Sequence, residues 1–118
     1  MTKKNILIVE DEAINAMLIK NILKADHNIL GICTNGADAI KQINELKPDF
    51  IIMDIFLDDE LTGIDVMNKI ISRNRIPHIY CTAYADESIL EKARKTGPEE
   101  ILIKPVKIPD IKKIIDQK

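Results

Sequence analysis

Short apolar runs are separated by amphipathic stretches along the whole chain. Each run is bounded by polar or turn residues, which is typical of strands buried on both faces of a sheet. The pattern therefore predicts five strands. They are Asn5–Val9, Ile29–Cys33, Phe50–Asp54, His78–Thr82 and Ile101–Ile103.

Between these runs, apolar residues recur at the spacing of a helix. In the first such stretch, after the acidic run Glu10–Glu12 and up to about Lys24, the recurring residues are Ile14, Met17, Leu18 and Ile22. Four further helices are predicted around residues 37–46, 64–71, 86–96 and 110–118. Pro48 ends the second helix, and Gly97 is placed to cap the C-terminus of the fourth.

Strands that alternate with helices require parallel crossover connections. We therefore expect an α/β fold, a doubly wound five-stranded parallel sheet with helices on both faces. The 118 residues fit one domain over residues 1–118.

Composition and charge limit the classes of function that this chain can have. Apolar residues make up 46% of the chain. The net charge of −2 lacks the basic excess that is typical of nucleic-acid-binding domains. Without an apolar run of membrane-spanning length or a signal peptide, we expect a cytoplasmic protein that binds neither nucleic acid nor membrane. Cys33 and Cys81 are expected to be buried free thiols, and His27 and His78 to have ordinary surface or strand-end roles.

Polar residues follow or end four of the predicted strands. Glu10-Asp11 follows the first, Asp54 and Thr82 end the third and fourth, and Lys104 follows the fifth. In a parallel sheet these ends share one edge, where ligands bind. Carboxylates held together repel, which raises their pKa or requires a cation such as Mg²⁺. With Lys104 and Thr82, such a site would neutralise a phosphoryl group and leave Asp54 as the nucleophile.

This set of residues, with Ala83 after Thr82 and Pro105 after Lys104, resembles the receiver domain of two-component response regulators. The resemblance covers essentially the whole chain. It implies the flavodoxin-like strand order 2-1-3-4-5 and a phosphorylation-controlled switch rather than an enzyme with turnover on an external substrate.

The resemblance also implies roles for single residues. Asp54 would be the phosphoacceptor, Thr82 would bond the phosphoryl oxygen, and Lys104 would pair with it through a loop that holds a cis Lys104-Pro105 bond. The implied Mg²⁺ ligands are Asp54, Asp11, Glu10 acting through water, and the backbone carbonyl of Phe56.

The partners implied by the resemblance are other proteins of the signalling system. A sensor histidine kinase or phosphotransfer protein would donate the phosphoryl group, and a downstream effector or a missing output domain would receive the signal. A homodimer would form through the fourth helix, fifth strand and fifth helix.

Several positions depart from the commonest family pattern, among them Ile101 and the loop after Asp54, and two variable positions, Phe56 and Tyr84, flank the expected site. Ile101 stands where an aromatic residue is usual, so we expect the signal to pass through Thr82 and residues 83–86. The loop after Asp54 is long and acidic, and we interpret Asp58–Glu60 as solvated. Phe56 and Tyr84 offer no short polar group to orient an attacking water, which predicts slow self-dephosphorylation.

Two other classes compete with this interpretation. A Mg²⁺-dependent phosphohydrolase of the haloacid-dehalogenase type would need an acid/base Asp two residues after Asp54, where this chain has Phe56. A flavodoxin-like carrier would need a phosphate loop after the first strand, where Glu10–Glu12 would repel a phosphate.

Overall fold

The computed structural model describes residues 3–71, 75–83 and 86–117. Strands and helices alternate along it as the sequence predicts. The strands are β1 (Asn5–Val9), β2 (Asn28–Cys33), β3 (Phe50–Asp54), β4 (His78–Thr82) and β5 (Glu100–Ile103). The helices are α1 (Ala13–Leu23), α2 (Gly36–Leu46), α3 (Gly63–Ile71), α4 (Glu87–Arg94) and α5 (Ile108–Asp116).

The predicted elements differ from the observed ones only at their ends. α5 begins at Ile108, before the predicted start, with a proline in its first turn, where the missing N–H costs nothing. Asp86 is the N-cap of α4, and its carboxylate accepts the Ser88 N–H at 2.9 Å. Gly97 has a φ of +71°, the left-handed conformation expected just beyond the helix.

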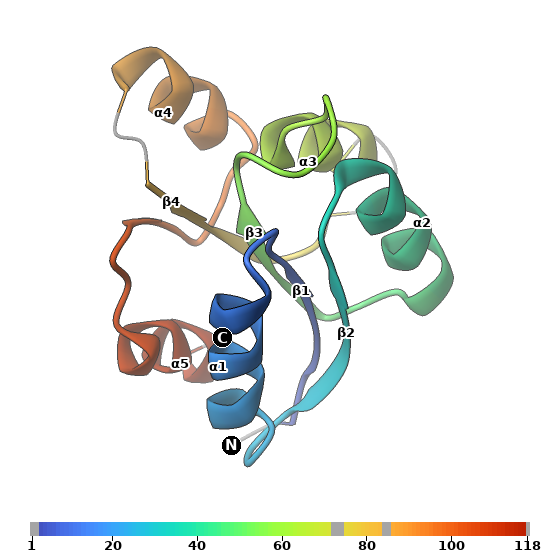
Figure 1. Cartoon of the computed structure of the whole chain (residues 1–118), viewed down its shortest axis with the longest axis vertical. Helices are drawn as coiled ribbons and strands as arrows, with labels where there is room; N and C mark the ends of the chain where they lie inside the picture. The colour runs from blue at the N-terminus through green and yellow to red at the C-terminus, as the bar shows by residue number, and fades with distance from the viewer. Residues whose placement is uncertain (1–2, 72–74, 84–85, 118) are drawn as a thin grey trace.

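The five strands form one parallel sheet in the order β2-β1-β3-β4-β5. β1 to β4 can be followed in Figure 1. This confirms the predicted fold class and strand order. β1 and β3 lie inside the sheet, and all of β3 is buried. The acidic end of β3 is therefore held by a strand that has little freedom to move.

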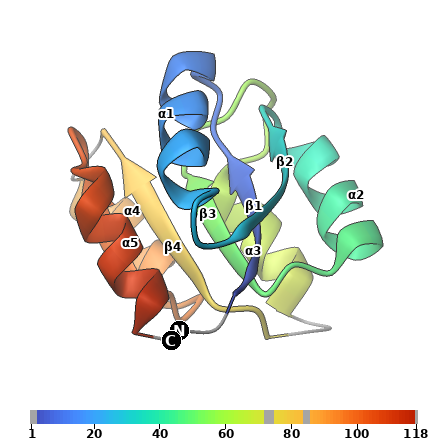
Figure 2. The ribbon, with the colours of Figure 1, turned by 90° about the horizontal axis from the view of Figure 1, so that it is seen from below.

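Two layers of helices cover the sheet (Figure 2). α1 and α5 pack on one face, where Ile19 and Ile111 contribute to a core with Phe50 and Ile52. α2, α3 and α4 pack on the other face, around a second core that includes Tyr80. Both faces of the sheet are apolar, as parallel sheets require.

The apolar residues whose spacing predicts α1 face the solvent in the structure. Its buried residues are instead Ala16, Ile19 and Leu23. The exposed residues form what we call the α1 stripe, and their exposed fractions are Ile14 77%, Met17 46%, Leu18 50% and Ile22 42%. α1 therefore adds both a core face and an apolar surface.

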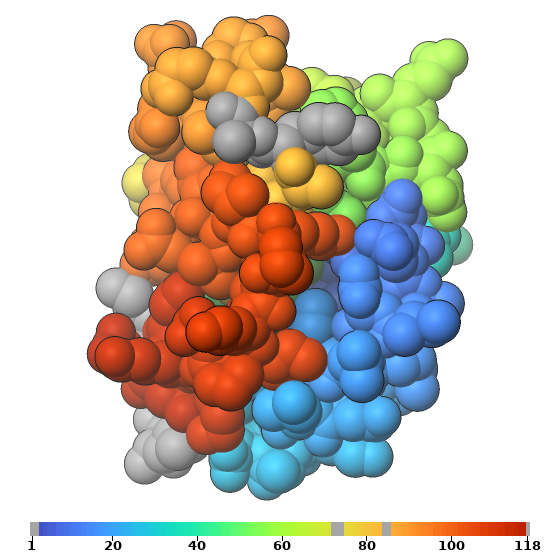
Figure 3. Space-filling view, turned by 60° about the vertical axis from the view of Figure 1, so that its left-hand side comes forward, coloured from blue at the N-terminus to red at the C-terminus, as the bar shows by residue number. Residues whose placement is uncertain are grey.

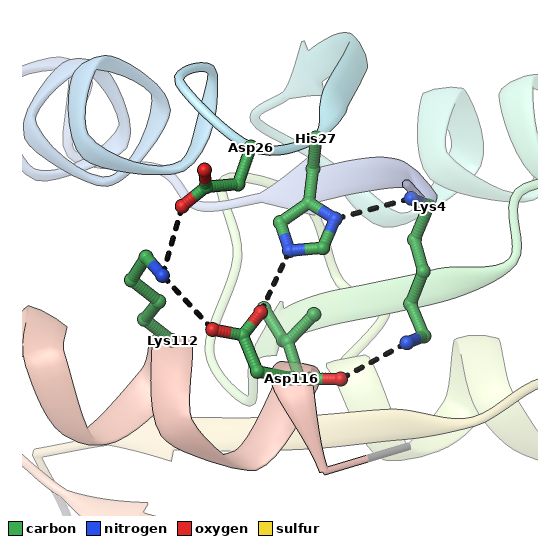
Figure 4. Close-up of polar contacts among 6 residues, drawn as sticks. Lys4, Asp26, His27, Lys112 and Asp116 are labelled. Carbon is green, nitrogen blue, oxygen red and sulfur yellow. Dashed lines mark hydrogen bonds and ion pairs between the residues drawn. The ribbon is translucent and has the colours of Figure 1, made fainter. Parts of the chain in front are cut away.

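The two histidines lie at strand ends, as expected, but both are buried rather than on the surface. His27 precedes β2 and joins a polar cluster with Lys4 and Asp116 (Figure 4). His78 begins β4, and its Nε2 lies 3.1 Å from the Thr96 hydroxyl.

Cys33 and Cys81 are both free and buried, in agreement with the prediction. They belong to β2 and β4, which β1 and β3 separate in the sheet. Among the described residues, no helix has the length and apolar character needed to cross a lipid bilayer.

Candidate functional site

The sheet brings the predicted site residues to one edge. Asp54 and Thr82 are the last residues of β3 and β4. Asp54 pairs in register with Cys81, and Thr82 with Ile103, the residue before Lys104. The backbone N–H of Lys104 donates to the Thr82 carbonyl at 2.7 Å. Because all the strands point the same way, their polar ends collect at their C-terminal side.

Lys104 is the centre of this group. Its Nζ lies 2.8 Å from Glu10 Oε1 and 3.1 Å from Asp54 Oδ2. Glu12, an exposed residue, contributes a third carboxylate oxygen at 3.6 Å. Glu10 and Asp54 are buried and the Lys104 side chain is 18% exposed, so these contacts are shielded from most of the solvent.

The carboxylates perturb one another. Burial, reinforced by the neighbouring Glu10 carboxylate, raises the pKa of Asp54 to about 8, although Lys104 opposes this. Burial also acts to raise the pKa of Glu10, but its hydrogen bonds with Asp54 and Lys104 outweigh burial and lower that pKa. Burial and Glu10 raise the pKa of Asp11. The site thus holds more negative charge than Lys104 neutralises.

The acidic residues fit a hard divalent cation. Carboxylate oxygens of Glu10, Asp11 and Glu12 lie within 4.8 Å of one another. Glu10 Oε2 is buried and has no hydrogen-bond partner among the described residues. A buried oxygen without a partner is costly, and a Mg²⁺ ion with its waters would satisfy it.

Glu12 was not among the predicted ligands. Its position as the third member of an acidic run was the only signal, and that run also suited the start of a helix. α1 begins after Glu12, which is its N-cap residue but makes no side-chain capping bond.

The remaining predicted residues are at or near this edge. The Thr82 side chain is buried, and the Lys104-Pro105 bond is cis, as the resemblance implied. Phe56 lies two residues beyond Asp54, with 38% of its surface exposed. Tyr84 lies outside the described residues.

Asp58–Glu60 are exposed, as expected, and belong to the loop of residues 55–62, which we call the β3–α3 loop. The loop is also attached to α2, which was not predicted. Asp59 accepts the N–H groups of Gly36 and Ala37 at 2.9 and 3.0 Å, so it caps α2. At the end of the loop, a Cβ on Gly63 would lie 2.1 Å from the Asp54 carbonyl oxygen. Neither contact joins neighbours in sequence, and neither was predicted.

This geometry agrees with comparisons to known proteins. The family model of the response regulator receiver domain matches residues 6–116. The chain belongs to the response regulator receiver family. It is therefore a receiver domain of the kind found in two-component signalling systems.

Curated relatives of this receiver domain include small and larger regulators. It is 36% identical to the chemotaxis protein CheY of Thermotoga maritima over 104 residues, 86% of each chain. It is 31% identical to the polar-differentiation response regulator DivK of Brucella anthropi, over 90% of this chain and 88% of the relative. Against the transcriptional regulatory protein PdtaR of Mycobacterium tuberculosis, at 32% identity, 92% of this chain matches 53% of the relative.

Solved receiver structures share the fold of this domain. The response regulator domain of Thermotoga maritima CheB superposes with a TM-score of 0.87 at 26% identity, over 98% of this chain and 96% of that one. A LuxR-family DNA-binding response regulator from Staphylococcus aureus gives a TM-score of 0.90 at 26% identity, over 97% of each chain.

Proposed function

We propose that this receiver domain is a switch controlled by phosphorylation of Asp54. The observation that carries the proposal is the position of Asp54. It is a buried carboxylate at the end of the central strand β3, paired with Lys104 at the edge where Thr82 also ends its strand. A buried nucleophile beside a fixed cation is suited to phosphoryl transfer, which depends on positioning and charge neutralisation.

In the proposed transfer, a carboxylate oxygen of Asp54 forms a bond to phosphorus. The bond from phosphorus to the donor histidine nitrogen breaks, and the imidazole keeps the electron pair. Lys104 would offset the charge of the phosphoryl oxygens, and the Thr82 hydroxyl would donate a hydrogen bond to one of them. The new contacts of Thr82 would then change the surface that partners bind.

Mg²⁺ is part of this proposal. Asp11, Asp54, Glu10 through water, and the Phe56 carbonyl would hold the ion, with Glu12 close by. When bound, it supplies positive charge that neutralises the carboxylates and the incoming phosphoryl oxygens. Asp54 must be ionised to act as a nucleophile, and a cation favours that ionised form.

The donor we propose is a protein, a sensor histidine kinase or a phosphotransfer protein. A donor histidine can reach Asp54 only if its protein covers the surface around the site. A hollow of about 470 Å³ lies beside Lys104 between α1 and the start of α5, lined by Leu18 and Ile108 among others (Figure 3). The α1 stripe continues from it, and this apolar surface fits a protein partner better than a small polar donor.

The output is also proposed to be another protein, an effector or an output domain. A second copy of the chain is expected to bind through α4, β5 and α5. Ile103 is 44% exposed in β5, and a groove of about 390 Å³ runs between α4 and β5 beside it. No hydrolase role is proposed, because Phe56 supplies no acid or base beside Asp54.

Phosphorylation by a small donor tests the proposal without knowledge of the kinase. Incubation with acetyl phosphate and Mg²⁺ should add one phosphoryl group to the intact chain, as measured by mass spectrometry. The Asp54→Ala variant should remain unlabelled, and the parent chain should lose most of its labelling when Mg²⁺ is chelated. Equal labelling of the parent and Asp54→Ala would overturn the assignment.

A further inference from the structure

Asp59 connects the β3–α3 loop to a helix that is distant in sequence. The first N–H groups of a helix have no partner within it. In α2, Asp59 accepts two of them, from Gly36 and Ala37, while Asn35 accepts the N–H of Asp38 at 2.8 Å. These N–H groups lower the pKa of Asp59, so the carboxylate stays ionised at neutral pH.

Further contacts hold the same part of the loop against α2. The Asp58 N–H donates to the Thr34 carbonyl at 3.1 Å. A Cβ on Gly36 would lie 2.5 Å from the Leu61 Cβ, so only glycine allows this close approach. The loop is therefore packed on the start of α2, with Asp59 supplying the charged part of the attachment.

The other end of the loop is closed beside Asp54. The Gly63 N–H donates to the Ile55 carbonyl at 2.6 Å, and Gly63 packs directly on the Asp54 backbone. Phe56 lies between this closure and the attachment at Asp59. The path of the backbone at Phe56 is thus fixed from both sides.

We propose that Asp59 is a positioning residue for the cation site. By holding the β3–α3 loop on α2, it sets where the Phe56 carbonyl lies relative to Asp54. Asp59 therefore controls the Mg²⁺ affinity of the site and, through it, the rate at which Asp54 is phosphorylated. This inference rests on the proposed function, since it assigns a role to the Phe56 carbonyl at the same site.

The chain offers a matched control in the neighbouring residue. Asp59→Ala removes the two bonds to α2, whereas Asp58→Ala removes the same charge from the same loop and keeps the Asp58 backbone bond. Asp59→Asn retains one acceptor oxygen in a side chain of nearly the same shape. The dissociation constant for Mg²⁺ would be measured by following backbone amide chemical shifts, and labelling by acetyl phosphate would be timed in parallel.

We expect Asp59→Ala to weaken Mg²⁺ binding about tenfold, the scale typical of residues that hold metal ligands in place. Asp59→Asn should fall between this variant and the parent, and Asp58→Ala should change binding less than about twofold, since an exposed charge is screened. Without Mg²⁺, exchange of both the Gly36 and the Ala37 amide protons should accelerate in Asp59→Ala, and neither should accelerate in Asp58→Ala. That readout identifies the loss of the attachment itself.

The outcomes separate the inference from the proposed function. If the parent binds Mg²⁺ and is labelled, but Asp59→Ala and Asp59→Asn bind Mg²⁺ as Asp58→Ala does, the positioning role is wrong and the switch remains. If the parent neither binds Mg²⁺ nor is labelled, the proposed function fails and the positioning role fails with it. An Asp59→Ala protein that does not fold leaves the comparison of Asp59→Asn with Asp58→Ala to decide.

Discussion

At the scale of single residues, two aspartates five positions apart have pKa values that are shifted in opposite directions. Burial and Glu10 raise the pKa of Asp54 to about 8, whereas the N–H groups of Gly36 and Ala37 lower the pKa of Asp59. In the sequence, both residues are aspartates at or shortly after the end of the same strand. What separates them is the surroundings, a buried acidic edge for one and a helix N-terminus for the other.

This contrast shows which part of the site the sequence can predict. Asp54, Thr82 and Lys104 follow from strand ends, because the topology of a parallel sheet brings those ends together. Asp59 and Gly63 act through a loop whose path depends on packing against other elements, and no periodic pattern reports that packing. The contacts of Asp59 with α2 and of Glu12 with Lys104 follow only from interatomic distances in the folded chain.

Gly63 provides a direct test of how closely the loop is fitted to Asp54. In Gly63→Ala the added Cβ would lie 2.1 Å from the Asp54 carbonyl oxygen and 2.6 Å from the Met53 Cγ, so the backbone must shift. We expect a loss of about 1–3 kcal/mol in the free energy of unfolding, as for other overpacked sites. Urea denaturation measures it.

Gly31→Ala is the matched control for that change. A Cβ there would meet only ordinary contacts, the nearest at 3.5 Å from Gln42 Oε1. Its effect should be neutral or slightly stabilising, because alanine restricts the unfolded chain more than glycine does. A Gly63→Ala protein as stable as Gly31→Ala would show that the contact with Asp54 relaxes at no cost.

At the scale of elements, α1 shows the limit of hydrophobic periodicity. The helix Ala13–Leu23 is apolar on most sides, so the pattern predicts that a helix forms but not which face enters the core. The smaller Ala16 faces the sheet, while Ile14 is 77% exposed. Leu18, also of the α1 stripe and 50% exposed, lines the hollow beside Lys104, which is consistent with a surface that binds a partner.

The start of β4, which packs against the segment between α4 and β5, contains a group that should make stability depend on pH. His78 is buried at the start of β4, beside the Thr96 hydroxyl, the Tyr80 ring and the Ile76 carbonyl. Burial lowers its pKa below the usual 6.5, and the charge of Arg75 acts in the same direction. The hydrogen bond to Ile76 and the charge of Glu99 oppose this shift. The unfolded chain therefore binds this proton more readily than the folded one.

Stability linked to His78 should consequently fall as the pH drops below about 6.5, by at most about 1.4 kcal/mol per pH unit for one proton. The free energy of unfolding of the parent and His78→Gln would be compared between about pH 7.5 and about pH 5.5. The raised pKa of Asp54 adds a slope of opposite sign to both proteins, so the test is the difference between them: the parent should lose stability relative to His78→Gln as the pH falls. Tyr80→Phe removes a hydroxyl from the same cluster but no group that titrates in this range, so it should keep the parent slope. Parallel slopes for the parent and His78→Gln would contradict the assignment.

At the scale of the whole molecule, the alternation of strands and helices was enough to predict the sheet and its two helical layers. The strand order 2-1-3-4-5 was predicted from the resemblance to receiver domains, and the structure confirms it. The contacts that join distant ends of the chain were not predicted. His27 and Asp116 are 89 residues apart, and nothing in either local sequence indicates that they meet.

Those ends meet in the cluster of Figure 4. The Lys4 backbone N–H donates to His27 Nδ1 at 3.1 Å, so the ring proton lies on Nε2, which donates to Asp116 at 2.9 Å. The Lys4 ammonium donates to the Ile115 carbonyl at 3.0 Å. Residues before β1, before β2 and at the end of α5 are thereby held together, with the His27 side chain fully buried.

We expect this cluster to stabilise the fold as a unit, with His27 contributing most. His27→Ala removes both ring contacts and leaves the Lys4 N–H without its partner, which should cost about 1–3 kcal/mol. Asp26→Ala removes only the ion pair with Lys112 at 2.8 Å, whose side chains are 37% and 30% exposed, and should cost less than about 1 kcal/mol. Urea denaturation of both variants at neutral pH measures the difference, with an unchanged m-value required for the comparison. Equal losses would mean that the buried ring adds no more to the stability than a surface ion pair does.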